Sequence, residues 1–355
     1  MKFGAALPTC AEGLGYPLGF ASADGLARIA EHAEALGFYA VMANDHICTP
    51  RWIRDQLARP PSFYEPLTTL AYCAARTSRL RLMTGVVVLP LREPVVLAKQ
   101  LTTLHQCSQG RLLAGVGPGA YRDEFESTLP RLRHASRADL MDEAVEALTL
   151  LLRQPRATFM SRHYAFDDVE LYPKAAQPEL PLFIGGNTER AIRRAGRYGA
   201  GWLPASLSPD HLARGKALLG QYAEEAGRDP TRLSVATQLV VCIGRTQQEA
   251  EERFKAPQVY QEWTSVGLSG VALADFLRAN LIGTPDEICR RVAVLERAGV
   301  DRLAGLIFPG DDVNEVLEQM EQFGESVIKA FSDSDSIAGP TPTSVATTNS
   351  ANKRS

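Results

Sequence analysis

The sequence predicts a single (β/α)8 TIM barrel, which belongs to the α/β fold class. Strand-like and helix-like segments alternate along almost the whole chain, the strand-like segments number eight, and a helix follows each of them. Repeated βα units indicate a parallel sheet, because each crossover must return the chain over the sheet face, and eight such units close a barrel. A doubly wound open sheet is the alternative, but it would need a break at the midpoint of the series of βα units, and the sequence shows none.

The expected strands are short apolar or β-branched runs, and several of them end at glycine or proline. They cover residues 2–8, 38–43, 80–89, 111–117, 182–185, 201–204, 233–243 and 303–308. The expected helices carry apolar residues at helical spacing, as in the first one, where Leu26, Ile29 and Ala33 share a face before Gly37 ends it. They cover residues 22–36, 67–76, 94–107, 136–152, 189–197, 209–227, 285–298 and 313–331.

Three connections are longer than ordinary loops and predict insertions after the second, fourth and seventh strands: residues 46–66, 119–135 and 255–280. Residues 158–172 alternate aromatic and polar side chains, which indicates a small hairpin. Residues 332–355 consist mainly of small and polar residues with little apolar content, so we expect a disordered tail behind a barrel domain of residues 1–331.

Composition excludes several functional classes. Charged residues make up 22% of the 355 residues and the net charge is −3, so no basic surface predicts a nucleic-acid or membrane partner. The six cysteines are scattered, which is typical of reduced thiols in a cytoplasmic protein. The N-terminal segment lacks a signal-peptide core, and no apolar run reaches membrane-spanning length. No metal-ligand motif occurs, so we expect no metal.

The working face of such a barrel is the C-terminal end of its strands. After the second strand come Asp45 and His46. A histidine beside a carboxylate suits proton transfer, because the ordinary histidine pKa lies near neutral. The alternative, in which Asp45 caps the loop and His46 is structural, fits the residues equally well.

The third strand contains Gly85 within a β-branched run, which indicates either a bulge against a flat ligand or a packing glycine, and the residues alone favour packing. The glycines that follow the fourth strand depart from a dinucleotide fingerprint, since Ala120 stands in place of glycine and no tight helix is expected after it. Asp123 or Glu124 could contact a polar ligand there, although a solvated acidic turn is more common.

After the fifth strand comes the turn Ile184-Gly185-Gly186-Asn187-Thr188, directly before a helix. Free backbone N–H groups and the positive end of the helix dipole predict a phosphate site. Glu189 argues slightly against an anion, whereas Arg190, Arg193 and Arg194 favour one. An ordinary capped turn is the alternative.

Several phrases in order give the chain a resemblance to the bacterial luciferase-like family of flavin- and deazaflavin-dependent oxidoreductases. They are Ala33-Glu34-Ala35-Leu36-Gly37-Phe38, Asn44-Asp45-His46, Thr84-Gly85-Val86-Val87-Val88-Leu89-Pro90, Lys99-Gln100-Leu101-Thr102-Thr103-Leu104, Gly110-Arg111-Leu112-Leu113-Ala114-Gly115-Val116-Gly117 and Ile184-Gly185-Gly186-Asn187. Within the family, the chain most resembles the actinobacterial branch that is usually assigned to the deazaflavin coenzyme F-420.

The resemblance implies a cis peptide bond between Gly85 and Val86 that backs the cofactor ring, with His46 as the catalytic proton-handling residue beside Asp45. It implies a cofactor site that comprises Thr84, Gly85, Val86, Gly117, Asp123, Gly185, Gly186, Asn187 and Thr188. The sugar-phosphate dehydrogenases of the family carry a glutamate where this chain has Ala120, which argues for a more apolar substrate space. The aromatic residues that could line this space are Trp52, Phe63, Tyr64, Tyr121 and Trp202, although scattered aromatic residues more often pack in a core or a lid.

From the resemblance we expect hydride transfer between reduced coenzyme F-420 and a small organic substrate. The alternative is a reduced-FMN-dependent monooxygenase that inserts one oxygen atom from O2 into an aldehyde, ketone or similar compound. A barrel that binds the cofactor without catalysis is a third choice. The resemblance also implies a homodimer through residues 67–107, although burial against the barrel itself explains the apolar content of that region equally well.

Overall fold

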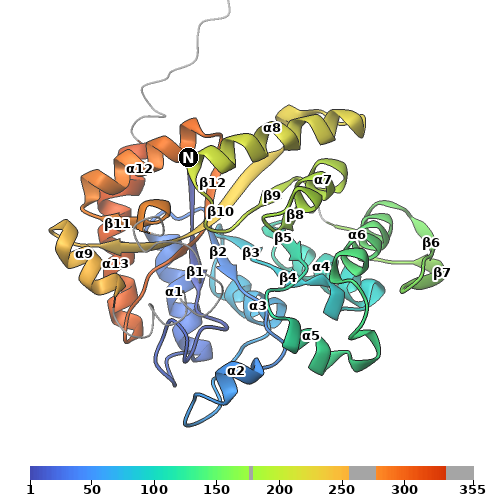
Figure 1. The fold of residues 1–355 in the computed structure, drawn as a ribbon, viewed down its shortest axis with the longest axis horizontal. Coiled ribbons are helices and arrows are strands. Elements are labelled where there is room, and N and C mark those ends of the chain that lie inside the picture. Colours follow the sequence, from blue (N-terminus) through green and yellow to red (C-terminus); the bar gives the residue numbers. More distant parts are fainter. Residues whose placement is uncertain (176–178, 256–276, 333–355) are drawn as a thin grey trace, which may run out of the picture.

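The computed structural model describes residues 1–175, 179–255 and 277–332. Within these residues, eight parallel strands close into a barrel (Figure 1). The strands in ring order are β1 (Lys2–Leu7), β2 (Ala40–Ala43), β3 (Arg81–Thr84) continued by β4 (Val87–Val88), β5 (Leu112–Gly117), β8 (Leu182–Gly185), β9 (Gly201–Leu203), β10 (Ser234–Ile243) and β12 (Arg302–Ile307). Because β10 pairs with both β9 and β12, and β12 pairs with β1, the ring is complete. The predicted barrel is confirmed, and the doubly wound alternative is wrong.

Helices cover the outside of the barrel, and each helix expected from the apolar spacing is present (Figure 1). They are α1 (Ala23–Ala35), α3 (Pro66–Arg76), α4 (Pro94–Cys107), α6 (Arg137–Arg153), α7 (Glu189–Tyr198), α8 (Pro209–Glu225), α12 (Pro285–Arg297) and α13 (Val313–Phe323). Several begin at a hydroxyl that accepts a backbone N–H of the first turn, as Ser22, Thr188 and Ser208 do. No helix in the described part of the chain is long and apolar enough to cross a membrane.

Apolar side chains fill both the inside and the outside of the barrel wall, as expected for parallel strands. The inner cluster draws on seven strands and consists of Met42, Met83, Leu113, Phe183, Leu203, Ala236 and Ala304. Met42 occupies space that two glycines leave open. A Cβ added at Gly85 would lie 2.2 Å from Met42 Sδ, and one at Gly305 would lie 2.0 Å from Met42 Cε. Gly85 therefore leaves room for the Met42 side chain inside the barrel, as the packing interpretation expects.

The structure departs from the expected elements in its short segments. The predicted strand 80–89 is split into β3 and β4, and the insertions after the second and fourth strands contain α2 (Arg51–Arg54) and α5 (Arg122–Thr128). In the segment that the structure describes here, no helix directly follows the glycines after the fourth strand, as expected, but a short helix that was not predicted, α5, begins five residues after Gly117. Helices this short carry too few apolar positions to show a period.

Other short elements lie outside the barrel wall. The predicted hairpin is confirmed as β6 (Arg156–Met160) paired antiparallel with β7 (Ala165–Glu170). The elements α9 (Gln247–Phe254) and β11 (Leu281–Gly283), which were not predicted, flank the third insertion. Most of that insertion, and all of the predicted tail after Ser332, lie outside the described residues.

The C-terminal ends of the barrel strands and the loops that follow them form what we call the mouth. The helices α2 and α5 lie together on this side of the molecule, opposite the N-terminus (Figure 1). Direct bonds join them, since Arg51 donates its backbone N–H to Asp123 and its guanidinium to Ser127. The two insertions therefore form one continuous rim beside the strand ends.

Candidate functional site

The mouth contains buried carboxylates. Among the described residues, the acidic side chains that are fully buried are Glu12, Asp45 and Glu124, with exposed fractions of 1%, 4% and 2%. They follow β1, β2 and β5, respectively. Burying a carboxylate costs free energy unless its oxygens are bonded. The Glu12 oxygens, for example, accept the backbone N–H groups of Ala21 and Ser62 at 2.7 and 2.8 Å. The mouth is thus a preorganised polar region above an apolar barrel.

Glu124 holds His46. The Nδ1 atom of His46 lies 2.9 Å from Glu124 Oε2, and Glu124 Oε1 accepts the backbone N–H of Ile47 at 2.5 Å. The carboxylate thereby fixes both the ring and the backbone that follows β2. With Nδ1 directed at Glu124, the ring keeps Nε2 for another molecule, and no described residue bonds that nitrogen. When Nδ1 donates to the carboxylate, Nε2 of the neutral ring can accept a proton, and the protonated ring can donate that proton back.

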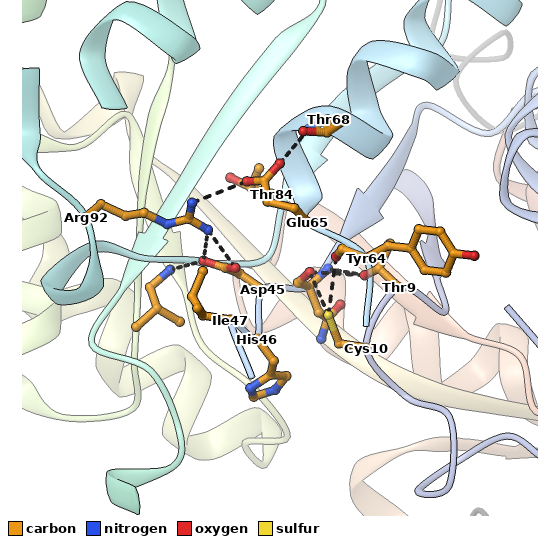
Figure 2. Close-up of polar contacts among 12 residues, drawn as sticks. Thr9, Cys10, Asp45, His46, Ile47, Tyr64, Glu65, Thr68, Thr84 and Arg92 are labelled. Carbon is orange, nitrogen blue, oxygen red and sulfur yellow. Dashed lines mark hydrogen bonds and ion pairs between the residues drawn. The ribbon is translucent and has the colours of Figure 1, made fainter. Parts of the chain in front are cut away.

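Asp45 points away from His46 (Figure 2). Its Oδ2 accepts the backbone N–H of Val88 at 2.8 Å, and both of its oxygens bond Arg92 Nη2 at 2.8 Å. Arg92 also reaches Glu65 at 3.4 Å. Burial raises the pKa of the Asp45 carboxyl, against the opposing effects of Arg92 and the Val88 N–H. The structure therefore does not pair Asp45 with His46; it uses Asp45 to tie the end of β2 to the segment after β3.

The partner of His46 was missed by the sequence analysis, which selected Asp123 for the site. Asp123 Oδ2 accepts the backbone N–H of Arg51 at 2.7 Å, so this side chain holds the start of α2. Glu124, one residue further along α5, turns inward instead, because consecutive residues of a helix point in different directions. Without α5 in the expected structure, no local signal separates the two acids.

Aromatic rings surround His46. The ring centroid of Tyr121 lies 5.0 Å from that of His46, and the centroid of Phe63 lies 5.8 Å away. Trp52 meets Tyr121 edge-on at 5.7 Å. Three of the five proposed pocket aromatics thus gather at one point, and all three are partly exposed.

The other two aromatics have different positions. Tyr64 donates its hydroxyl to Ala21 O at 3.4 Å, within the rim. Trp202 is 1% exposed in the core and donates Nε1–H to Gly186 O at 2.7 Å. Trp202 therefore supports the turn after β8 from beneath.

The bulge between β3 and β4 stands beside this polar cluster. The peptide bond between Gly85 and Val86 is cis, as the resemblance implies. A Cβ on Gly117 would lie 2.6 Å from Val86 Cγ2, and one on Gly185 would lie 2.7 Å from Val86 Cγ1. These two glycines therefore leave the space that the Val86 side chain occupies at the mouth.

Polar groups support the bulge from both sides. The Thr84 hydroxyl donates to Gly115 O at 2.7 Å and accepts the Gly115 N–H at 2.8 Å. The hydroxyl replaces strand pairing at the point where the ladder to β5 is interrupted, and Thr84 is fully buried within the wall. From β10, Gln238 donates to Gly85 O at 3.4 Å.

The turn before α7 presents free backbone donors. Gly186 has a φ of 127°, which lies in the region that favours glycine. Thr188 caps α7 by accepting the Ala191 N–H, and the Asn187 amide is bonded in both directions to the backbone of Ala205. The backbone N–H groups of Asn187 and Thr188 find no acceptor among the described residues. The backbone of this turn, rather than its side chains, is available to an anion.

The arginines that follow the turn do not add positive charge for an anion there. Arg190 pairs with Asp139 and Asp142 on α6, and Arg194 also pairs with Asp142. Arg193 donates to the Tyr222 hydroxyl at 3.3 Å, on the side of α8. The expectation that these cations favour an anion at the turn is therefore wrong, because they join α7 to its neighbouring helices.

Comparison with known proteins gives consistent relatives. A family model described as luciferase-like monooxygenase matches residues 1–302. The F-420-dependent hydroxymycolic acid dehydrogenase of Mycobacterium tuberculosis is 30% identical over 222 residues, which are 62% of this chain and 59% of that protein. The chain thus spans less than two thirds of that relative. The FMNH2-dependent dimethylsulfone monooxygenase of Pseudomonas fluorescens is 26% identical over 328 residues, or 85% of each protein.

Solved structures share the fold. The monooxygenase RslO1 from Streptomyces bottropensis superposes with a TM-score of 0.75 at 25% identity, over 93% of this chain and 100% of that one. An F-420-dependent secondary alcohol dehydrogenase superposes with a TM-score of 0.74 at 20% identity, over 92% and 98% of the two chains. The barrel and its order of elements are therefore shared with these two structures.

Proposed function

The chain belongs to the luciferase-like monooxygenase family of oxidoreductases, and we propose that it transfers hydride between reduced coenzyme F-420 and a small organic substrate. Members of this family use either the deazaflavin or FMN, as the two curated relatives do. Besides a surface for a cofactor, the mouth contains a histidine that could transfer a proton. We base the proposal of the deazaflavin on this histidine.

The residues of the mouth fit a flavin-type coenzyme. The unbonded backbone N–H groups of Asn187 and Thr188, at the positive end of α7, would hold its phosphate. Val86 would face the flat ring, since Gly117 and Gly185 add no side chain on either side of it. When bound, the coenzyme supplies or accepts the hydride. The chain contributes position and proton handling.

The observation that carries the proposal is the His46–Glu124 pair. Reduction of a carbonyl by hydride leaves an oxygen that needs a proton, and oxidation of an alcohol releases one. His46 would hold that proton at Nε2. Glu124 keeps the ring in one orientation and, since its second oxygen binds the Ile47 N–H, cannot itself turn toward a substrate without losing a bond. Glu124 is thus a positioning residue for His46.

A reduced-FMN-dependent monooxygenase is the second candidate. The FMNH2-dependent relative covers 85% of this chain, against 62% for the F-420-dependent one. Both coenzymes combine a tricyclic ring, a ribityl chain and a phosphate, so the turn before α7 and the Val86 bulge suit either. The turn and the bulge therefore support the cofactor class and not the choice within it.

Titration of the pure protein with coenzyme F-420 and with FMN, in both redox states, tests the choice. We expect tighter binding of the deazaflavin, and turnover of a substrate without oxygen consumption. Tighter binding of reduced FMN, accompanied by substrate-dependent oxygen consumption, would replace the first proposal with the second.

The phosphate position has its own test, Thr188→Asp. Aspartate keeps the helix cap but adds a negative charge at the free N–H groups. We expect coenzyme affinity to fall about tenfold with little change in thermal stability. Ser208→Asp, at the cap of α8, is the matched control and should leave affinity unchanged. Equal affinities in both variants would move the phosphate away from this turn.

A further inference from the structure

The rim of the mouth places an aromatic surface beside the one unbonded nitrogen of His46. We propose that this surface selects the substrate, and that the substrate is an uncharged, largely apolar molecule with a hydroxyl or carbonyl group. This inference rests on the proposed function, because it assigns the substrate class to the site that contains His46. It concerns the rings of Trp52, Phe63 and Tyr121, which we call the aromatic wall.

The aromatic wall is assembled from separate segments. Trp52 lies in α2, Phe63 lies in the same insertion before α3, and Tyr121 immediately precedes α5. Two of the rings contact the His46 ring itself, at centroid distances of 5.0 and 5.8 Å, and the third meets Tyr121 edge-on. Rings that were only core packing would be fully buried. All three instead keep partial exposure, as does the His46 side chain at 15%. A molecule that bonds His46 Nε2 could therefore contact these rings.

Charge at this position disfavours an anionic substrate. The buried carboxylate of Glu124 lies directly behind His46, and Asp123 adds a second acid on the same short helix. The Arg92 guanidinium is paired with Asp45 and Glu65, and the Arg51 guanidinium is directed to the Ser127 hydroxyl on α5. An anion brought to His46 Nε2 would lie close to the Glu124 carboxylate, with which no arginine or lysine among the described residues forms an ion pair.

A cationic substrate is disfavoured for a different reason. Aromatic faces attract cations, but the carboxylate that would complete such a site is already used. One Glu124 oxygen bonds His46 and the other bonds the Ile47 N–H. An ammonium group at Nε2 would be attracted by Glu124 and Asp123 only through the His46 ring, and without a direct carboxylate bond this attraction must offset its desolvation cost. An uncharged molecule pays neither cost: a hydroxyl group can donate to Nε2, and a carbonyl oxygen can accept from Nε2 when the ring is protonated.

Three probes of the same shape separate these cases: cyclohexanol, cyclohexylamine as its ammonium ion, and cyclohexanecarboxylate. Binding to the full-length protein at neutral pH is measured by saturation-transfer NMR with each probe titrated to saturation. We expect cyclohexanol to bind best. Stronger binding of the ammonium or of the carboxylate, or no saturable binding of cyclohexanol, would overturn the inference.

Variants assign the binding to the aromatic wall. Tyr121→Ala and Trp52→Ala should each weaken cyclohexanol binding about fivefold, whereas Tyr72→Ala, which removes an exposed tyrosine from α3, should leave it unchanged. Two wall variants are used so that a loss of folding in one, seen by circular dichroism, leaves the other decisive. Unchanged cyclohexanol binding in a folded wall variant would overturn the assignment.

The outcome can be distinguished from failure of the proposed function. If cyclohexanol binds through the wall but neither coenzyme is bound, the proposed function fails and the substrate class stands. If the protein turns over a charged substrate with coenzyme F-420 and excludes cyclohexanol, the proposed function stands and the substrate class fails.

Discussion

His46 at the mouth and His163 in the outer hairpin have nearly the same local geometry. Each bonds a glutamate through Nδ1, at 2.9 Å to Glu124 and at 2.8 Å to Glu143, and each side chain is largely buried, with exposed fractions of 15% and 10%. The pairs differ in what surrounds them. The first joins the loop after β2 to α5, 78 residues away in sequence, at the mouth of the barrel, whereas the second joins a hairpin turn to α6 over 20 residues.

The second oxygen of each glutamate also distinguishes the pairs. Glu124 uses it for the Ile47 N–H, next to a strand end. Glu143 uses it for the Ser161 hydroxyl and the His163 N–H, so that the whole turn between β6 and β7 is clamped to α6. A histidine–carboxylate bond therefore does not identify a site by itself. Its position in the barrel decides whether the free nitrogen faces a substrate space or an outer surface.

Replacement of the two histidines gives the largest expected contrast. His46→Ala should lower turnover about 100- to 10,000-fold, because it removes the proton-handling group, while coenzyme affinity changes little. His163→Ala should leave turnover unchanged and lower the free energy of unfolding by about 1 kcal/mol. Steady-state kinetics, coenzyme titration and denaturant unfolding measure the three quantities. Equal losses of turnover in both variants would make His46 a structural residue.

Replacement of the two glutamates should give the same contrast in turnover as replacement of the two histidines, but a smaller one. An amide offers one acceptor oxygen and one NH2 donor, so Glu124→Gln can satisfy both Ile47 N–H and His46 Nδ1 only by moving the ring proton from Nδ1 to Nε2. Turnover should therefore fall about 10- to 100-fold. Glu143→Gln is the matched control, with turnover kept. A fall in coenzyme affinity that matches the fall in turnover would show that Glu124 supports the cofactor surface and not the histidine.

The smallest expected effect is the pH dependence of the hairpin clamp. Burial alone would raise the pKa of Glu143, but the Ser161 hydroxyl and the His163 ring and N–H bring it below the ordinary value. A carboxylate with a lowered folded-state pKa stabilises fully above its unfolded pKa and loses this contribution as the pH falls through the folded value. At pH 7 the free energy of unfolding of the wild type should exceed that of Glu143→Gln by under about 1 kcal/mol. This difference should become smaller as the pH is lowered below the ordinary glutamate pKa.

Unfolding in denaturant at several pH values measures that difference. Glu325→Gln, at an exposed position on the outer helix shell, serves as the control. A difference for Glu143→Gln that stays constant with pH would show that the clamp holds the hairpin by shape and not by charge.

The barrel itself was predictable because its signals are local. Each strand and long helix carries its own apolar period and its own stop residue, such as Gly37 after α1 or the proline-started α4. The turn before α7 was found for the same reason, since its glycines and its Thr188 cap are neighbours in sequence. The short helices α2 and α5 were missed because they have too few residues to show a period.

The partners of the polar side chains were not predictable. The sequence places Asp45 beside His46, yet alternation along the extended chain sends the two side chains in opposite directions. Glu124 reaches His46, Arg92 reaches Asp45, and Arg190 reaches α6 only because barrel closure brings those loops and helices together.

The sequence alone therefore determined the fold class, the position of the mouth and the residues that could do chemistry there. Periodicity and turn chemistry depend only on neighbours along the chain, and barrel closure follows from repeating them. The tertiary structure alone decided which of these residues meet. The tertiary structure shows that Glu124 holds His46 beside the aromatic wall. No local sequence pattern indicates these contacts, because they join segments that are far apart in the chain.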